Sequence, residues 1–222
     1  SVASRTLDRL GRPLAIMRLS VSDRCNLRCA YCMPEESYTW LPKARLLSFE
    51  ELSHLVDIFL GLGVDKLRLT GGEPLLRQEL EELVALLSVK PGLRDLALTT
   101  NGVLLADKAQ ALRQAGLQRL TVSLDTLDPA RFQALTKRDE LTAVLAGIEA
   151  ARQAGFARIK LDSVMLRGTN DDELVPLMEF ARTHDLELRY IEYMDVGGAT
   201  QWSPRAVLPR AEILERLAGE YG

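Results

Sequence analysis

Apolar residues recur along the chain in two rhythms, one typical of strands and the other of helices. Alternating apolar residues predict strands at 15–22, 64–71, 93–100, 117–124, 157–166 and 186–194. Helical periodicity between them predicts amphipathic helices at 48–63, 104–117, 141–156 and 170–185. This repeated strand–helix order predicts an α/β fold with a parallel sheet, curled into an incomplete (β/α)6 barrel.

Two of the predicted helices begin with recognisable capping residues. Ser48 is followed three residues later by Glu51, the pairing of a capping box, and Gly61 or Gly63 marks the end of that helix. The helix over 170–185 is expected to be capped by Asn170 or Asp171.

The predicted strands place polar side chains together on one face, and the opposite faces are apolar and suited to packing against helices. The polar face comprises Arg18, Ser20, Ser22, Lys66, Arg68, Thr70, Thr99, Asn101, Lys160 and Asp162. A closed barrel normally fills its interior with branched apolar side chains. We therefore expect a polar, cationic ligand cavity, with salt bridges at the strand ends as the alternative interpretation.

Composition and charge exclude several other classes. The 222 residues suffice for one substantial domain, with 47% hydrophobic and 27% charged residues. A net charge of −3 without a long basic block gives no reason to expect nucleic acid. No apolar run reaches the ~18 residues of a membrane span, and SVASRTLDRLGRP does not resemble a signal peptide. We expect a cytoplasmic protein without a membrane partner.

The three cysteines of the chain, Cys25, Cys29 and Cys32, lie in one short segment. This C-x3-C-x2-C spacing disfavours a disulfide framework and is typical of a metal site in a reducing compartment. A structural zinc site needs four ligands, and His54 and His184 fall in or at the ends of predicted helices. Three thiolates on a 4Fe–4S cluster leave one iron open for a non-protein ligand, which is a catalytic arrangement.

With Tyr31 before its last cysteine, this segment resembles the signature of the radical S-adenosylmethionine superfamily. The resemblance implies a 4Fe–4S cluster on the three cysteines, whose open iron binds S-adenosylmethionine and whose electron releases a 5′-deoxyadenosyl radical. TGGEP, residues 70–74, is similar to the superfamily's turn against the methionine amino group. There, consecutive glycines would let the backbone approach a ligand and Glu73 would accept from the ammonium; a plain strand-to-helix turn is the alternative.

Three further strand ends carry polar or glycine-containing loops: TTNG (99–102), SLDTLD (123–128) and YMDVGG (193–198). In barrel folds the carboxyl ends of the strands form the rim on which active sites are built. Ser123 would reach the ribose or carboxylate of the cofactor, or else cap a turn. Met194 would pack on the adenine, or else belong to the core.

From about residue 14 to 202 the chain resembles the GTP 3′,8-cyclases, also called molybdenum cofactor biosynthesis protein A. The segments that carry the resemblance, in order, are RLSVSDRCNLRCAYCMP, LRLTGGEPLLR, LALTTNG, VSLDTLDP, VLAGIEAARQAG, LRGTND and LRYIEYMDVG. The implied reaction abstracts the ribose 3′ hydrogen of GTP, and the sugar radical attacks C8 of guanine. The product, 3′,8-cyclo-7,8-dihydro-GTP, is the first intermediate toward molybdopterin.

The resemblance also implies a role for individual residues. Contacts to S-adenosylmethionine are implied for Tyr31, Gly72, Ser123 and Met194, beside the expected role of Glu73. Contacts to GTP are implied for Arg18, Arg68, Thr99 and Lys160. Three of these four are the cations already expected inside the barrel, where a triphosphate would be attracted. No catalytic side chain is expected beyond the cluster ligands and the cofactor radical.

The chain departs from the family in two respects, the cysteines of a C-terminal segment and the residue at position 162. Family members hold a second cluster with further cysteines in a C-terminal segment and end in a Gly-Gly tail, whereas Cys32 is the last cysteine here. We therefore expect part of a longer protein, with a partial barrel over 1–205 and the start of a C-terminal segment over 206–222. Asp162 stands where many relatives have Asn, and is expected to pair with Lys160 and weaken phosphate binding.

The expected partners are GTP, an electron-donor protein and a downstream enzyme of the molybdopterin pathway, with a homodimer as an open question. Two other functions also stay open. One is a different radical S-adenosylmethionine enzyme, such as a peptide maturase, and the other is a non-catalytic iron–sulfur or zinc module that serves a partner. Iron and sulfide analysis separates the last of these, because a cluster brings about four irons per chain and a zinc site one metal.

Overall fold

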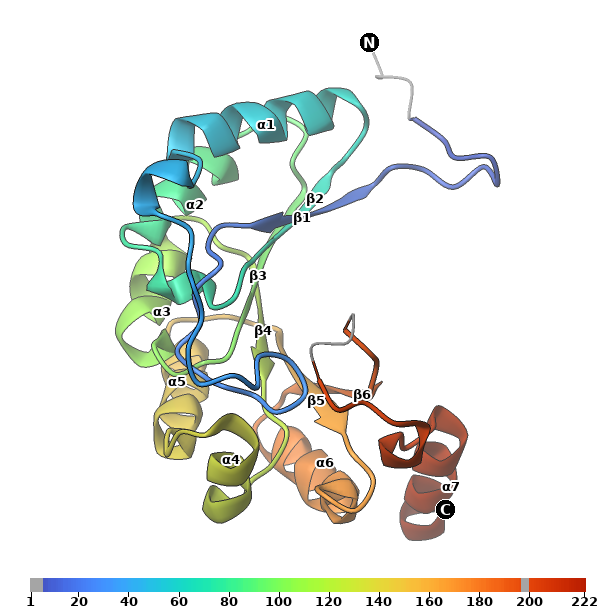
Figure 1. Cartoon of the computed structure of the whole chain (residues 1–222). Helices are drawn as coiled ribbons and strands as arrows, with labels where there is room; N and C mark the ends of the chain where they lie inside the picture. The colour runs from blue at the N-terminus through green and yellow to red at the C-terminus, as the bar shows by residue number, and fades with distance from the viewer. Residues whose placement is uncertain (1–5, 197–199) are drawn as a thin grey trace.

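The computed structural model describes residues 6–196 and 200–222, which form one curved sheet of six parallel strands covered by helices (Figure 1). In sheet order the strands are β1 (Ile16–Ser20), β2 (Lys66–Thr70), β3 (Asp95–Thr100), β4 (Arg119–Ser123), β5 (Ile159–Met165) and β6 (Glu187–Glu192). Every expected strand is confirmed. Within the described ranges β1 and β6 are edge strands that do not pair, so the barrel is incomplete, as expected.

Helices line the convex side of the sheet and leave its concave side open (Figure 1). They are α1 (Phe49–Gly61), α2 (Leu80–Ser88), α3 (Leu105–Gln114), α4 (Pro129–Thr136), α5 (Leu141–Gln153) and α6 (Leu174–Thr183). A further helix, α7 (Arg210–Tyr221), lies beyond β6 and contacts α6. The expected helices correspond to α1, α3, α5 and α6, and the structure adds α2, α4 and α7. No helix in the described part of the chain is long and apolar enough to cross a membrane.

The core lies between the sheet and this helical layer. Its strand residues are fully buried leucines such as Leu69, Leu98, Leu120 and Leu161, each 0% exposed. On the concave face, polar neighbours such as Arg18, Arg68 and Thr99 are half-buried or exposed instead, whereas Thr121 is buried. The alternation expected from the sequence is therefore confirmed, and it leaves the concave face free to bind a polar ligand.

One helix cap is confirmed and the other is wrong. Ser48 and Glu51 form the complete capping box of α1. Helix α6 instead begins at Leu174, after a 3-10 turn, and Asn170 is 0% exposed. Its side-chain amide donates to the carbonyls of Asp125 and Val164, at 2.7 and 2.9 Å. Asn170 thus joins the ends of β4 and β5, and its side chain makes no capping hydrogen bond.

The residues after β6 pack back onto the barrel. Val207 forms an isolated bridge with Leu166, just beyond β5. Leu208 and Ile213 belong to a small second core that also contains Met165, Leu174 and Leu177. Residues 197–199 lie outside the described ranges, and with them the last two residues of the YMDVGG motif (193–198).

Candidate active site

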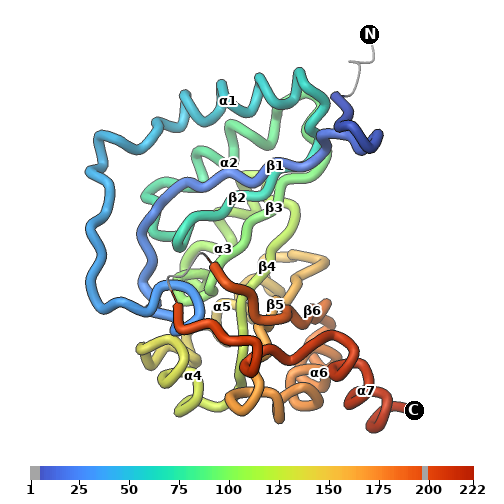
Figure 2. Tube along the Cα trace, turned by 45° about the vertical axis from the view of Figure 1, so that its right-hand side comes forward, coloured from blue at the N-terminus to red at the C-terminus, as the bar shows by residue number. Residues whose placement is uncertain are grey.

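The segment between β1 and α1 carries the three cysteines across the sheet to α4 before it returns (Figure 2). The N–H groups of Arg28 and Ala30 donate to the carbonyls of Thr136 and Leu135, at 2.8 and 2.9 Å. Both acceptors lie in the last turn of α4. The segment that carries the cysteines (residues 21–36, here called the cysteine loop) is therefore held by the end of α4 as well as by β1, the strand that it follows.

The three thiols line one cavity. Cys25, Cys29 and Cys32 surround a volume of about 340 Å³ together with Gly71 and Gly72, among others. All three are free cysteines, and Cys32 is exposed. Burial raises the pKa of each thiol, that of Cys29 to about 12, so a metal must displace their protons to bind.

The donor set fits a cluster better than a single ion. Within the described ranges, no group of three or more His, Cys, Asp or Glu is arranged to hold one metal ion. The three thiols nevertheless share the 340 Å³ cavity, and thiolates are the ligands of iron–sulfur clusters, in which each cysteine takes a separate iron.

Arg28 holds the cysteine loop in shape. Its guanidinium donates to the carbonyls of Cys25 and Leu27, both at 2.8 Å. The same group lies over the rings of Tyr38 and Trp40, 5.4 and 5.5 Å from their centroids. One side chain thus ties the first cysteine to the segment that follows the last one.

Gly71 and Gly72 are required by the chain's own backbone. A Cβ on Gly71 would lie 2.5 Å from the carbonyl oxygen of Ser22, and one on Gly72 would lie 2.4 Å from that of Arg24. Gly72 and Glu73 donate their N–H groups to the same two carbonyls, at 2.8 and 2.6 Å. The sequence suggested close approach to a ligand; the structure shows that these glycines also admit the segment that leads into the cysteine loop.

Glu73, expected to accept from a ligand's ammonium, is buried and bonded to groups of the chain itself. Its carboxylate is 1% exposed and accepts from the N–H groups of Leu75 and Asn101 and from the Thr100 hydroxyl, at 2.9, 2.7 and 2.7 Å. Burial raises the pKa of Glu73 and these hydrogen bonds oppose the rise. The carboxylate thus joins the turn after β2 to the end of β3, and its contact with a ligand's ammonium stays a prediction.

Asn101 makes contacts that the sequence did not predict. Its side-chain amide donates to Oδ1 of Asn26 at 2.8 Å and reaches the sulfur of Cys25 at 3.9 Å. Its backbone N–H is held by Glu73. The sequence placed Asn101 at the carboxyl end of a strand, on the rim. That position does not determine which groups its side chain contacts.

A smaller cavity of about 160 Å³ joins the cysteines to the ends of β3 and β4. Its lining includes Tyr31, Gly72 and Ser123, three of the residues for which cofactor contacts were implied. Met194 is not part of this lining; it follows β6 and is 64% exposed.

Asp125, which the sequence did not single out, holds Tyr31 across this cavity. The Tyr31 hydroxyl donates to one carboxylate oxygen of Asp125, and the N–H of Val164 donates to the other at 2.8 Å. Asp125 is 6% exposed, and burial raises its pKa to about 6. The only sequence signal was its position in the rim segment SLDTLD.

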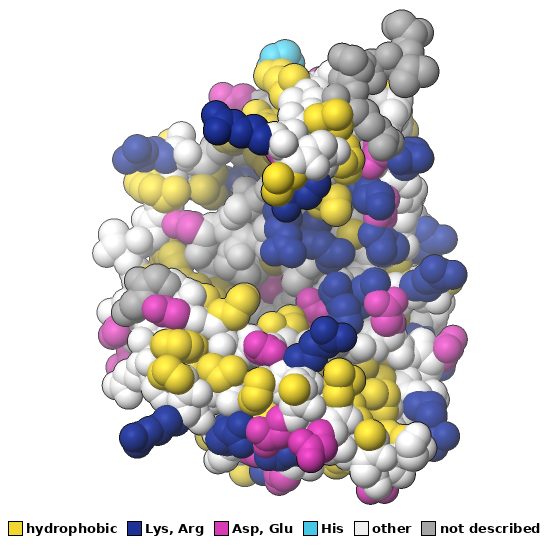
Figure 3. Space-filling view, turned by 90° about the vertical axis from the view of Figure 1, so that its right-hand side faces the viewer, with side chains coloured by type: hydrophobic (Ala, Val, Ile, Leu, Met, Phe, Trp, Pro, Cys, Tyr) yellow, Lys and Arg dark blue, Asp and Glu magenta, His cyan; other side chains and the backbone are white. Residues whose placement is uncertain are grey.

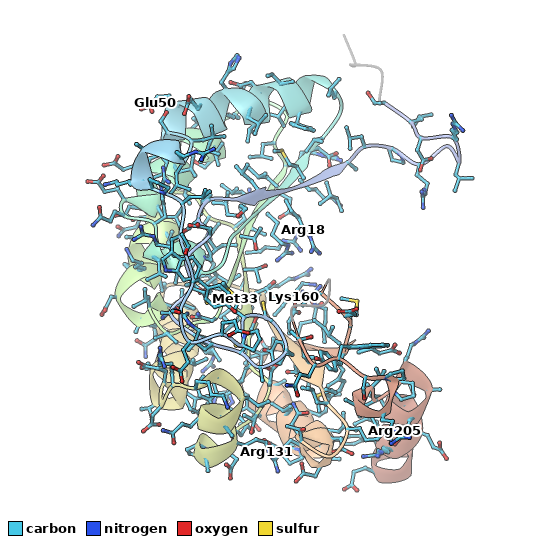
Figure 4. The ribbon with its side chains drawn as sticks, in the orientation of Figure 1. Arg18, Met33, Glu50, Arg131, Lys160 and Arg205 are labelled. Carbon is cyan, nitrogen blue, oxygen red and sulfur yellow. The ribbon has the colours of Figure 1, made fainter. Side chains whose placement is uncertain are left out.

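A third cavity, of about 330 Å³, lies on the concave face and is cationic. Its lining residues are Arg18, Arg68, Thr70, Thr99, Asp162, Arg189, Tyr190 and Ile191. Figure 3 shows Lys and Arg side chains gathered on this open side, and Figure 4 shows Arg18 reaching from β1 into the concavity. Thr70 and Thr99 also line the 160 Å³ cavity, so the cationic and cysteine-lined spaces adjoin.

Arg68 is the central cation of this cavity. One of its guanidinium nitrogens donates to the hydroxyls of Thr99 and Thr121, both at 2.9 Å. Burial lowers the pKa of Arg68, and the charge of Arg189 lowers it further. Such crowding of like charges is relieved when an anion binds.

The ion pairs on β5 differ from the expectation. Lys160 pairs with Glu187 and does not line the cationic cavity, whereas Asp162 pairs with Arg189 at 2.6 Å. The register sets both pairs, because Lys160 lies opposite Glu187 and Asp162 opposite Arg189. Directly opposed residues on adjacent strands are about 5 Å apart, closer than the roughly 7 Å between alternate residues of one strand.

Known proteins similar to this chain are radical SAM proteins, and the similar curated sequences are named GTP 3′,8-cyclase. Residues 19–181 match the model of the radical SAM superfamily. "GTP 3′,8-cyclase 3" of Mycobacterium bovis is 57% identical over 219 residues, which cover 97% of this chain and 58% of that protein. "GTP 3′,8-cyclase 1" of Mycobacterium tuberculosis is 56% identical, over 98% of this chain and 62% of its own length. The chain thus spans about three fifths of these relatives (58% and 62%).

Solved structures share the fold at low sequence identity. Streptococcus suis SuiB bound to its precursor peptide SuiA superposes with a TM-score of 0.74 at 18% identity, over 94% of this chain and 46% of SuiB. Methylornithine synthase (PylB) gives 0.71 at 17%, over 93% of this chain and 62% of PylB. At this identity the likeness concerns the partial barrel alone.

Proposed function

The chain belongs to the radical S-adenosylmethionine superfamily, and on that premise we propose that it cyclises GTP to 3′,8-cyclo-7,8-dihydro-GTP, in the first step toward molybdopterin. The observation that carries this proposal is the junction of two cavities. The cysteine-lined space and the arginine-lined space share Thr70 and Thr99. A ligand anchored by its phosphates on one side would present its other end to the cofactor on the other.

On the cysteine side, Cys25, Cys29 and Cys32 would hold the 4Fe–4S cluster. When bound, the cluster supplies the electron that cleaves S-adenosylmethionine held at its open iron. The protein's part is positioning: Tyr31, fixed by Asp125, would border the cofactor, and Gly72 and Ser123 would line its site.

Glu73 would act indirectly by holding the turn that carries Gly72. Met194, beyond β6, would approach the cofactor from the outer side of the rim. The burial of Glu73 and the 64% exposure of Met194 support these proposed roles.

On the cationic side, Arg18 and Arg68 would bind the phosphates of GTP. Guanidinium groups suit phosphate because their hydrogen bonds are charge-assisted and directional. Thr99 is held by Arg68 at 2.9 Å and would border the ligand at the junction. Lys160 would join them only by exchanging its partner Glu187 for the substrate.

We further propose that a second cluster, on cysteines of a segment that this sequence does not include, binds the guanine. The longer sequences of the relatives named GTP 3′,8-cyclase support this proposal. An electron-donor protein would deliver its electron near the exposed Cys32. The product would pass to the next enzyme of the molybdopterin pathway.

The test is conversion of GTP by the full-length natural protein, purified without oxygen and supplied with S-adenosylmethionine and dithionite. We expect 5′-deoxyadenosine and the cyclised nucleotide from GTP, and no cyclised product from ATP or CTP. An enzyme that forms 5′-deoxyadenosine without consuming any nucleotide would contradict the proposal and point to another substrate, such as a peptide.

A further inference from the structure

The cationic cavity holds one acidic side chain, Asp162, among its lining residues. Oδ1 of Asp162 lies 2.6 Å from Nη2 and 2.8 Å from Nε of Arg189. The two side chains are 20% and 41% exposed. The carboxylate therefore engages the guanidinium through two of its nitrogens at the wall of the cavity, with the kind of charge-assisted contact that a phosphate oxygen also makes to arginine.

The two principal cations of this cavity are not neutralised in this way. Within residues 6–196 and 200–222, Arg18 and Arg68 form no ion pair with a carboxylate, and Arg68 is held by threonine hydroxyls instead. Lys160 has its own partner, Glu187, outside the cavity lining. In this cavity Arg18 and Arg68 can therefore accept an anionic ligand, whereas Arg189 is already paired with Asp162.

Asp162 also reduces repulsion among these arginines. The charges of Arg189, Arg119 and Arg18 disfavour the charged form of Arg68, and the charge of Asp162 favours it. In the free protein the carboxylate therefore stabilises the crowded cations. In a complex with a polyphosphate, the same carboxylate repels the ligand.

We propose that Asp162 is an internal counter-anion, which holds Arg189 while the cavity is empty and releases this arginine to a phosphate group when a polyphosphate binds. The inference rests on the proposed function in taking a nucleoside triphosphate as the ligand. Asp162 then sets the affinity of the cavity: it makes the free protein more stable and binding of the phosphates weaker. Only an exchange of partners within the cavity is involved, and no proton or covalent bond needs to change.

The experiment measures binding of inorganic tripolyphosphate and of guanosine to the full-length holoenzyme and to Asp162→Asn. Asn keeps the size of the side chain and an oxygen for Arg189 but removes the charge. The matched control is Asp57→Asn, which removes the same charge from an ion pair with Lys90 in the outer helical layer. Tripolyphosphate should bind Asp162→Asn about tenfold more tightly, since one unit of like charge is removed beside the ligand. Guanosine binding and the control should be unchanged.

Thermal unfolding gives a second readout. Without ligand, Asp162→Asn should melt below the wild type, and tripolyphosphate should raise its melting temperature more than that of the wild type. If the single variant does not fold, Asp162→Asn combined with Arg189→Gln leaves no unpaired charge. This double variant should bind tripolyphosphate more tightly than Arg189→Gln alone.

Unchanged or weaker tripolyphosphate binding by Asp162→Asn would overturn the inference, even with a lowered melting temperature, because it would leave Asp162 a purely structural role. Equal binding by the double and single variants in the second design would overturn it too. Failure of the proposed function looks different. In that case tripolyphosphate binds and responds to Asp162→Asn as expected, while the wild-type enzyme cyclises no GTP. Absence of tripolyphosphate binding to the wild type would overturn both.

Discussion

The cysteine side and the cationic side of the site are built in different ways. The cysteine loop is fixed by backbone hydrogen bonds to β2 and α4, by close contacts at Gly71 and Gly72, and by Arg28. The cationic side depends on charged side chains whose partners, such as Asp162 and the threonines beside Arg68, sit within reach of a ligand. A ligand can therefore exchange partners on the cationic side, whereas the cysteine side is held by contacts within the chain itself.

The largest effect is expected from Gly72→Ala. Its Cβ would lie 2.4 Å from the carbonyl oxygen of Arg24, so the loop entering the cysteines must move. We expect a loss of about 3 kcal/mol or more in the free energy of unfolding and a strong loss of bound iron. Chemical denaturation and iron analysis measure both. Gly61→Ala is the control, because its Cβ would meet nothing within 4 Å; equal behaviour of the two variants would contradict the fixed-loop account.

A smaller but selective effect is expected from Arg68→Gln. Loss of charged hydrogen bonds to phosphate costs roughly 1.5–3 kcal/mol, which is about 10- to 150-fold in GTP affinity. Iron content should stay at the wild-type level, because Arg68 belongs to the cationic side. Calorimetry with GTP measures the affinity. The control is Arg152→Gln, because Arg152 forms an exposed ion pair with Glu149 on α5. Undiminished GTP binding would remove Arg68 from the substrate site.

Arg28→Lys should weaken the cysteine side alone. Lysine keeps the charge but cannot donate to two carbonyls while stacking on Tyr38 and Trp40. We expect a loss of about 1–2 kcal/mol in stability and faster loss of iron to a chelator. Arg45→Lys, an exposed substitution in the same long loop, should behave as the wild type. Equal rates of iron loss in the two variants would contradict the role assigned to Arg28.

The smallest effect concerns pH. Burial raises the pKa of Asp125 to about 6, above its usual value near 4, so the folded state binds a proton that the unfolded state releases. The contribution of Asp125 to stability therefore increases as pH falls from 8 to 5. Asp125→Asn should lack this contribution, so the stability of the wild type relative to the variant should rise over that interval. A pH-independent difference in unfolding free energy would contradict the assignment.

The sequence was sufficient for the fold and insufficient for the pairing of side chains. Alternation located all six strands and the polar concave face, because burial of leucines such as Leu69 and Leu98 is a local pattern. The partner of Asp162 depended on the register between β5 and β6, whose paired residues are 27 apart in the chain. The role of Glu73 likewise depended on how the turn after β2 meets the end of β3.

The most direct test of the account uses GTP that carries deuterium at the ribose 3′ position. The full-length natural protein is incubated without oxygen with this GTP, S-adenosylmethionine and dithionite, and 5′-deoxyadenosine is examined by mass spectrometry. We predict that the 5′-deoxyadenosine carries deuterium and that Cys29→Ser forms none of it. 5′-Deoxyadenosine without deuterium, formed while GTP stays intact, would contradict the claim that these two cavities together bring GTP to the cofactor.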